Sequence, residues 1–294
     1  MLHTIKNEYL EVTVNALGAQ LWSVLASDGT QVLWQGDKTY WADRALTIFP
    51  YVARLWQGQY MLDGEIHTMP IHGFAPESCF ALAEKTDSRM VFALEDSEKT
   101  RAQYPRRFIF RVEYALEGDT LAVTYAVENR DEKPMFFGLG GHPGFNVPLE
   151  AGKAFEDYRL RFAEKCESLR VGFSPECFVT GEDAAFPLEE GTLLPLRHDL
   201  FDDDAIVLRD MARSVTLEAP GGSHSVTVSF PDMPYLGIWH WPKTDAPYVC
   251  IEPWASLPAR HGEVTCFEKQ PDLIRLEPGR VYENRWMIRV GTGG

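Results

Sequence analysis

The sequence has few basic residues, an odd number of cysteines and no long apolar run, and each of these features excludes a class of protein. The chain has 28 basic and 43 acidic residues, a formal net charge of -15. An acidic surface repels polyphosphate, so we expect neither nucleic acid nor an anionic membrane as a partner. The five cysteines contain no C-x-x-C pair, which indicates reduced thiols rather than a disulfide framework.

No targeting or membrane segment is indicated. The N-terminal MLHTIKNEYLEVTV lacks a basic stretch followed by an apolar one, so it is not typical of a signal peptide. No apolar stretch reaches membrane-spanning length. We therefore expect a soluble, cytoplasmic protein. Its 294 residues, 45% of them hydrophobic, can bury a substantial core, and residues 1–294 are expected to form one domain.

Alternation of apolar and polar residues dominates the chain and predicts an all-β fold. In RRFIFRVEYALEG the even positions from Phe108 to Leu116 are apolar, and the alternation resumes after Gly118-Asp119, which predicts a hairpin. A second hairpin is predicted around Gly221-Gly222 and a third paired region over residues 8–27, with a closing strand at 281–290. So many antiparallel strands must each hide one face, which favours a large β-sandwich.

The stretch FFGLGGHPGFNVPL, residues 136–149, presents a single histidine among glycines and prolines. Its G-x-G-x-x-x-G spacing is not a dinucleotide fingerprint, because Pro148 prevents the helix that would hold a pyrophosphate. We expect a strand end that turns at Gly140-Gly141 and fixes the His142 ring at the mouth of a sheet. The alternative is a buried histidine with a purely structural hydrogen bond.

Two other segments carry residues suited to chemistry. Residues 47–75 contain Arg54 and a second histidine, His72, before Gly73. Residues 231–258 contain the apolar strand YVCI, which ends in Glu252. A carboxylate at the end of a buried strand is costly unless something pairs with it or uses it.

Together these segments resemble the aldose 1-epimerase (galactose mutarotase-like) family, especially its LacX-like branch. The resemblance covers nearly the whole chain, and it is carried by the motifs FPYVARLWQGQYMLDG, MPIHGFA, GGHPGFNVPL, LFDDDAIVL, PYLGIWHWP and VCIEPW. It implies a β-sandwich with an active site in a cleft across one sheet, and a reaction that needs no cofactor and no metal.

The resemblance also implies roles for individual residues. Glu252 matches the catalytic base, His142 the general acid and His72 a second histidine near the ring oxygen of the sugar. Arg54 matches a substrate-binding arginine. The carboxylate that bonds sugar hydroxyls is Asp203 or Asp204, since the run of three aspartates leaves the register open.

Other candidate sites have a simpler interpretation. Most tryptophans of a sandwich belong to its core, and Trp239 or Trp254 is the better candidate for a cleft wall. The aspartate run 202–204 lacks the spacing of a calcium loop. No histidine pair has zincin spacing and no G-x-S-x-G is present, so a zinc protease and a serine hydrolase are not indicated.

Three functions therefore stay open for this sequence. The first is an aldose mutarotase acting on a free hexose, in which Glu252 and His142 exchange protons with the C1 hydroxyl and the ring oxygen. The second is a hexose-6-phosphate epimerase, which needs a basic cluster that Arg54, Arg260 and Lys243 only sparsely provide. The third is a carbohydrate-binding protein without catalysis. A glycosidase needs two facing carboxylates and fits less well.

Overall fold

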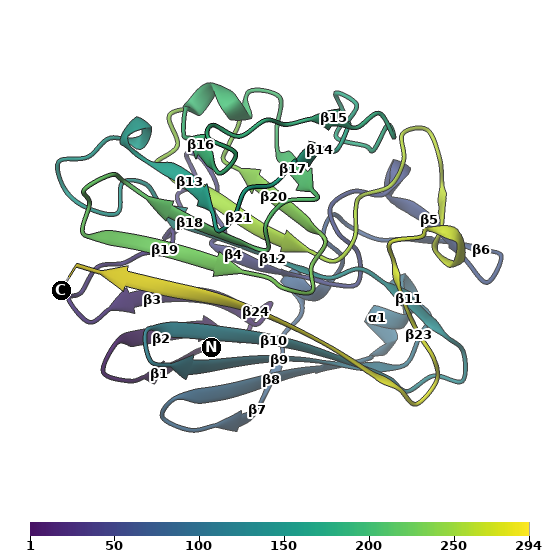
Figure 1. Ribbon diagram of the computed structural model, residues 1–294. Coiled ribbons are helices and arrows are strands. Elements are labelled where there is room, and N and C mark those ends of the chain that lie inside the picture. The colour runs from purple at the N-terminus through teal and green to yellow at the C-terminus, as the bar shows by residue number, and fades with distance from the viewer. Residues whose placement is uncertain (294) are drawn as a thin grey trace.

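The computed structural model describes residues 1–293, which form an almost entirely β structure built on two large antiparallel sheets. The larger sheet has nine strands in the order β16-β13-β18-β19-β24-β10-β9-β8-β7 and runs from the top to the bottom of the view in Figure 1. Its strands are β7 (Ala81–Lys85), β8 (Arg89–Glu95), β9 (Phe108–Glu117), β10 (Thr120–Asn129), β13 (Arg159–Phe162), β16 (Leu193–Pro195), β18 (Ser214–Glu218), β19 (His224–Ser229) and β24 (Val281–Thr292).

The second large sheet has seven strands in the order β15-β14-β17-β20-β21-β12-β4. Its strands are β4 (Ala45–Ile48), β12 (Gly140–Asn146), β14 (Leu169–Arg170), β15 (Ala184–Ala185), β17 (Ile206–Arg209), β20 (Tyr235–Trp239) and β21 (Tyr248–Trp254). The segments that carry His142 and Glu252 are the neighbouring strands β12 and β21, so this sheet is the one that positions the candidate site.

Three small sheets and a few short helices complete the described chain. The small sheets contain β1 (Leu2–Lys6), β2 (Leu10–Asn15) and β3 (Gln20–Ala26); β11 (Met135–Phe137) and β23 (Ile274–Leu276); and β5 (Gln59–Leu62), β6 (Glu65–Thr68) and β22 (Thr265–Cys266). The helices are α1 (Glu98–Gln103) and the 3₁₀ turns Trp56–Gly58, Ala75–Glu77, Phe155–Asp157, His198–Phe201 and Phe267–Lys269. None of these helices combines the length and the apolar character that crossing a membrane requires.

The predicted hairpins are confirmed. Strands β9 and β10 pair from Glu117↔Thr120 onward, so the turn between them is Gly118-Asp119, and Gly118 has the positive φ of +62° that such a turn favours. Strands β18 and β19 flank Gly221-Gly222 and pair antiparallel. Strands β2 and β3 form the third pair, and β24 is the closing strand.

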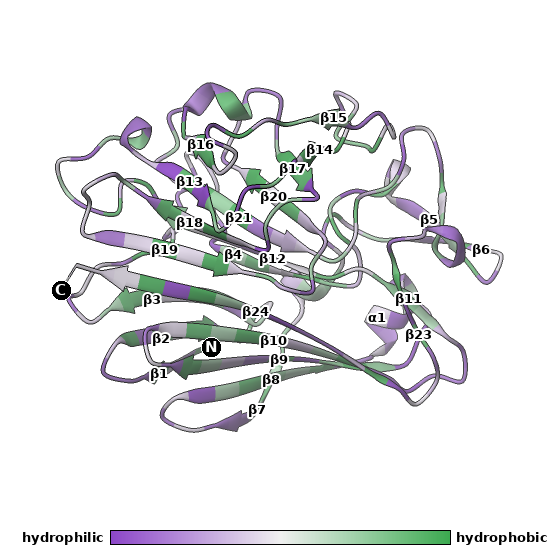
Figure 2. Cartoon of the chain, in the orientation of Figure 1, coloured by the Kyte–Doolittle hydropathy of each residue, from purple (hydrophilic) through white to green (hydrophobic). Residues whose placement is uncertain are grey.

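The core lies between the two large sheets, because each contributes a buried apolar face to one continuous cluster of side chains. Figure 2 shows apolar residues gathered on the strands and polar ones frequent in the loops at their ends. Close packing of the sheets is visible at Gly141 on β12: an added Cβ there would lie 2.6 Å from Cζ2 of Trp286 on β24. The indole therefore occupies the space that Gly141 leaves open.

The turn expected at Gly140-Gly141 is wrong. Gly140 and Gly141 begin strand β12 and pair with Ile48 and Thr47 of β4. Both glycines are needed for close packing on the two faces of a continuous strand, and neither has a positive φ. Glycine in a strand can mark the close approach of another group.

We expect Gly141→Ala to lower the free energy of unfolding by about 1–3 kcal/mol, the usual cost of overpacking a core, because its methyl group meets the Trp286 ring. Urea unfolding measures the change. The double variant Gly141→Ala/Trp286→Phe should be less destabilised than the two single losses add up to, since the smaller ring makes room for the methyl group. Full additivity of the two substitutions would show that this contact does not limit the packing.

Candidate active site

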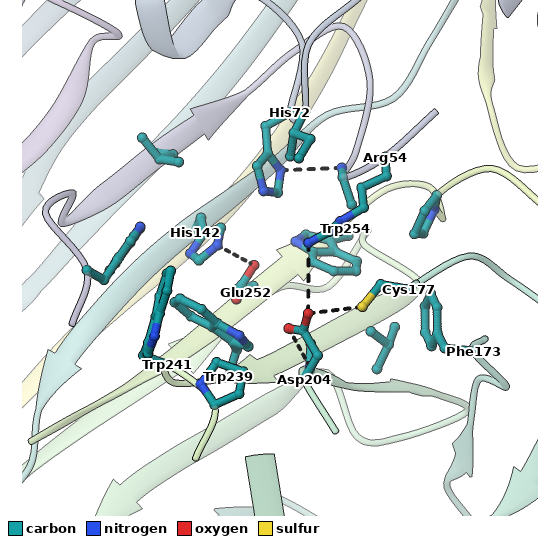
Figure 3. A pocket seen from close by; sticks show the side chains of 18 of the residues that line it. Arg54, His72, His142, Phe173, Cys177, Asp204, Trp239, Trp241, Glu252 and Trp254 are labelled. Atoms are coloured by element: carbon teal, nitrogen blue, oxygen red, sulfur yellow. Dashed lines mark hydrogen bonds and ion pairs between the residues drawn. The ribbon is translucent and has the colours of Figure 1, made fainter. Parts of the chain in front are cut away.

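A cleft of about 500 Å³ lies on the face of the seven-stranded sheet opposite to the one that packs on Trp286. Its volume is in the range of pockets that hold a small ligand. Figure 3 shows the side chains that surround it. The lining residues are Trp41, Leu46, Ala53, Arg54, Ile71, His72, His142, Phe173, Cys177, Asp203, Asp204, Ala205, Val207, Trp239, Trp241, Pro242, Glu252, Trp254 and Pro258.

Strand register brings His142 and Glu252 together on the floor of this cleft. Gly140 pairs with Trp254 and Gly144 with Cys250, and this register sets His142 opposite Glu252. Residues directly opposite each other in an antiparallel pair point to the same face of the sheet. Two residues separated by more than a hundred positions therefore become neighbours by strand pairing alone.

The same row of the sheet continues on both sides of this pair. Leu46 of β4 pairs with His142, Gly237 of β20 pairs with Glu252 and Val207 of β17 pairs with Gly237. The floor of the cleft is thus one row that crosses five strands, with two apolar ends and a polar centre.

The two polar side chains at this centre are buried and close. His142 Nε2 lies 3.3 Å from Glu252 Oε2, and Figure 3 shows the contact. His142 is 7% and Glu252 1% exposed. The contact is not aligned as a hydrogen bond, since Glu252 Oε2 has no hydrogen-bond partner, and neither does His142 Nδ1. Buried polar atoms without a partner are rare in proteins and need an explanation, and here they point to a ligand that supplies the missing bonds.

Burial moves the two pKa values in opposite directions, each toward the neutral form. Burial, with a smaller effect of Asp204, raises the pKa of the Glu252 carboxyl well above its usual value. Burial, followed by the neighbouring His72 ring, holds the pKa of His142 well below the usual value of a histidine. A neighbouring carboxylate raises the pKa of a histidine in general, but the cost of desolvating the imidazolium outweighs that attraction here.

His72 enters the cleft from the segment that follows β6. Its backbone has a φ of +64°, and its N–H donates to the Ala53 carbonyl over 2.9 Å. The Ala53 N–H in turn donates to His72 Nδ1 over 3.3 Å. Because Nδ1 is an acceptor, the hydrogen of the neutral ring must be on Nε2. Burial and the nearby Arg54 cation lower the pKa of His72 to about 4, so the ring is a neutral donor at neutral pH.

Arg54 and Asp204 face each other at the side of the cleft. Arg54 Nη2 lies 3.9 Å from Asp204 Oδ2, and Figure 3 shows both side chains at the cavity. Asp203 and Asp204 both line the cleft, but Asp203 is exposed and Asp204 is partly buried. The structure therefore favours Asp204 as the carboxylate that a ligand would meet.

Gly140 and Gly237 make room for the Trp254 indole. An added Cβ at Gly140 would lie 2.8 Å from Trp254 Cδ1, and one at Gly237 would lie 3.0 Å from Trp254 Cζ2. The indole is buried and its Nε1 has no hydrogen-bond partner. Trp254 is therefore a wall of the cleft beside Glu252, with a donor that the protein leaves free.

Aromatic rings also fix the orientation of His142. The Trp41 ring stacks on the imidazole with centroids 4.8 Å apart and planes 27° apart. Trp239 meets the same imidazole edge to face at 5.7 Å, and His72 does so at 5.3 Å. A ring packed on several sides cannot rotate freely, so His142 is held in one orientation toward Glu252.

One group of side chains in the described residues could in principle hold a metal ion. Ligand atoms of His142, Cys250 and Glu252 lie within 4.8 Å of one another, and zinc accepts such donors. Zinc binds the thiolate, however, and burial together with Glu252 raises the pKa of the Cys250 thiol well above its usual value. A metal ion would have to displace that proton, and we assign none.

The structure brings all eight residues selected from the sequence into this one cleft: Arg54, His72, His142, Asp203, Asp204, Trp239, Glu252 and Trp254. Sequence reasoning missed Trp41, Phe173 and Cys177, which also line it. Trp41 was assigned to the core along with most tryptophans. Phe173 and Cys177 lie in an irregular segment with no periodicity, so no signal in the sequence identified them.

Comparisons with known proteins are consistent with this geometry. The family model described as aldose 1-epimerase matches residues 1–288. The chain is 34% identical over 283 residues to the chromosomal protein LacX of Lactococcus lactis subsp. lactis, covering 93% of this chain and 94% of the relative. The plasmid-encoded LacX of the same organism is 33% identical over 286 residues, with 93% and 94% coverage.

Two solved structures are similar over their whole length. A galactose mutarotase related enzyme from Lactobacillus acidophilus has a TM-score of 0.94 at 31% identity, covering 99% of this chain and 98% of that one. A galactose mutarotase-like protein from Lactobacillus casei has a TM-score of 0.92 at 33% identity, with 99% and 100% coverage. The β-sandwich expected from the sequence is thereby confirmed.

We expect His72 to titrate at a pKa of about 4 with the hydrogen of the neutral ring on Nε2, because protonating Nδ1 would also break its bond from Ala53. Long-range ¹H–¹⁵N NMR of the imidazoles measures both properties. In Arg54→Gln the pKa of His72 should rise toward 6.5, since a neighbouring cation is removed. A His72 ring that titrates near 6.5 in the unmodified chain would contradict the assignment.

Proposed function

The chain belongs to the aldose 1-epimerase family, and on that premise we propose that it is an isomerase that interconverts the α and β anomers of an unphosphorylated hexose. One observation carries the proposal: the buried contact of 3.3 Å between His142 Nε2 and Glu252 Oε2, both open to a cleft of sugar-like size.

Anomer exchange requires an acid and a base close to each other. The C1 hydroxyl must lose its proton while the ring oxygen gains one, and both oxygens are bonded to C1. The groups that serve them must therefore be near neighbours, as His142 and Glu252 are. We assign Glu252 as the base for the C1 hydroxyl and His142 as the acid for the ring oxygen. The opened aldehyde rotates about C1–C2, and the same two groups close the ring on its other face.

The directions of the pKa shifts define the number of protons on this pair. Burial favours a protonated Glu252 beside a neutral His142. The reactive form, a Glu252 carboxylate beside a protonated His142, contains the same number of protons. The two forms differ only in which member of the pair has the proton, so no net uptake from solvent is needed. Sugar hydroxyls that bond the unpartnered atoms of both side chains favour the charged form, because they replace lost hydration.

The remaining polar side chains suit the binding of a neutral sugar. The Nε2–H of His72 and the Arg54 guanidinium donate to sugar oxygens, and Asp204 accepts from a hydroxyl. Trp254 and Trp239 supply apolar walls. Among the described residues that line the cleft, Arg54 is the only lysine or arginine, and it already faces Asp204. A phosphate group attracts several cations, so this lining supports a hexose over a hexose 6-phosphate. Neither Arg260 nor Lys243 is part of it.

The proposal predicts that the protein accelerates mutarotation and that the acceleration depends on both members of the pair. Polarimetry of freshly dissolved α-glucose, α-galactose and their 6-phosphates measures it. Glu252→Gln and His142→Ala should each lower kcat by ~10²- to 10⁴-fold, the usual contribution of one proton-transfer group. We expect saturation by a free hexose and a lower kcat/KM for its 6-phosphate.

His240→Gln is a matched control for His142→Ala, because His240 is also a buried histidine, directly after strand β20 of the same sheet, and does not line the cleft. It should retain activity. A protein that binds hexose by calorimetry without accelerating mutarotation would be a carbohydrate-binding protein, and the enzyme proposal would be wrong. Near-native activity of either pair variant would remove that residue from the mechanism.

A bell-shaped dependence of kcat/KM on pH is also expected, since the pair reacts only with one transferable proton. In acid the pair takes up a second proton, and no base remains. Because burial lowers the pKa of His142, this loss of activity occurs below pH 6.5. On the alkaline side the pair loses its proton as the pH rises through the raised pKa of Glu252, well above 4.5. The two limits are properties of the pair. An acid limit at or above pH 6.5, after subtraction of buffer catalysis, would contradict this reading.

A further inference from the structure

The cleft contains a thiol that the chemistry above does not use. Cys177 lies in the irregular segment between Phe173 and Val179, which pair as a short bridge. Its backbone N–H donates to the Ser174 carbonyl over 2.9 Å, and its φ is +65°. The Sγ–H donates to Asp204 Oδ2 over 3.0 Å, and Figure 3 shows this contact beside the one to Arg54.

The Asp204 carboxylate is held by two neutral donors. Its Oδ1 accepts from the Ala205 N–H over 2.9 Å, and its Oδ2 accepts from Cys177. The distance of 3.9 Å from Oδ2 to Arg54 Nη2 is longer than a hydrogen bond. Across residues 1–293, no side-chain hydrogen bond of the Arg54 guanidinium is found. The cation and the carboxylate are thus close, but each keeps bonding capacity unused.

Such a separation needs a cause, because arginine and carboxylate groups form strong bidentate pairs when nothing prevents it. A small rotation of the Asp204 side chain would close the gap. In the closed pair the guanidinium would donate to the carboxylate oxygens. A sugar would have to break these bonds before binding. The Cys177 thiol bonds the oxygen that faces Arg54, so it opposes that rotation.

Resting on the proposed function, we propose that Cys177 is a positioning residue for the substrate, whose thiol holds the Asp204 carboxylate away from Arg54 so that both remain free for sugar hydroxyls. Two further observations support it. Burial and the bond to Asp204 raise the pKa of the thiol to about 12, so it stays a donor at neutral pH. The same cleft contains the unpartnered buried atoms Glu252 Oε2 and His142 Nδ1, which mark it as the place of a ligand.

The test compares Cys177→Ala with Cys177→Ser, which keeps a donor in place. We expect the alanine variant to raise KM for the preferred hexose by about three- to tenfold, the effect of one weak hydrogen bond to a charged group, with kcat changed by less than about twofold because the acid–base pair is untouched. The serine variant should recover most of the loss. Cys266→Ala is a matched control: its thiol also donates to a carboxylate, Glu268, over 3.2 Å, but it does not line this cleft, and its KM should not change.

The crystal structure of Cys177→Ala supplies a readout that does not depend on catalysis. We expect the distance from Arg54 to Asp204 to shorten to that of a hydrogen bond. An unchanged separation, an unchanged KM, or a loss of kcat at constant KM would each overturn the role of Cys177. Failure of the unmodified protein to accelerate mutarotation of any hexose would instead overturn the proposed function, and the crystallographic distance would still decide whether the thiol holds the carboxylate.

Discussion

The register of β12 against β21 is the constraint on which the rest of the site depends. It sets His142 opposite Glu252, and a shift of one residue would place the two side chains on opposite faces of the sheet, one of them toward the sandwich core. The register is protected because the other face of β12 fits Trp286 of the nine-stranded sheet through Gly141. The packing of the core therefore fixes the geometry of the cleft on the opposite face of the sheet. It holds His142 and Glu252 in place.

The same burial that fixes the pair also keeps it neutral. Both side chains are almost inaccessible to water, so neither charge is well solvated. The protein does not hydrogen-bond all polar atoms of this pair, since Glu252 Oε2 and His142 Nδ1 have no partner. Such a site favours a ligand that brings hydroxyl groups without net charge, because an ionic group would add a desolvation cost of its own. The electrostatics of the cleft floor and the scarcity of cations on its walls thus both favour a ligand that has hydroxyl groups and no net charge.

Much of the fold was predictable from the sequence, and so were the polar members of the cleft. Alternation located the hairpin at Gly118-Asp119 because one face of β9 is buried and the other is mostly partly exposed. The motifs around His142 and Glu252 were readable because a histidine among glycines and a carboxylate after YVCI stand out from their surroundings. The role of Gly140 was misread: a local pattern does not distinguish a turn from a strand that a distant indole crosses. The pairing of remote segments decides between a turn and a strand, and the periodicity of one segment contains no information about that pairing.

What the sequence could not reveal lies mainly in the irregular segments. Cys177 and Phe173 reach the cleft from a loop, where position depends on backbone conformations such as the φ of +65° at Cys177 and not on a repeat. Asp204 also has a positive φ, of +74°, and it is less exposed than its neighbour Asp203. Under the proposed function, the sheet therefore positions the acid–base pair, and the loops supply the contacts to the sugar hydroxyls. Because loops are less constrained by core packing than a sheet is, residues 173–179 and 202–205 supply the part of the cleft lining that the sandwich fixes least.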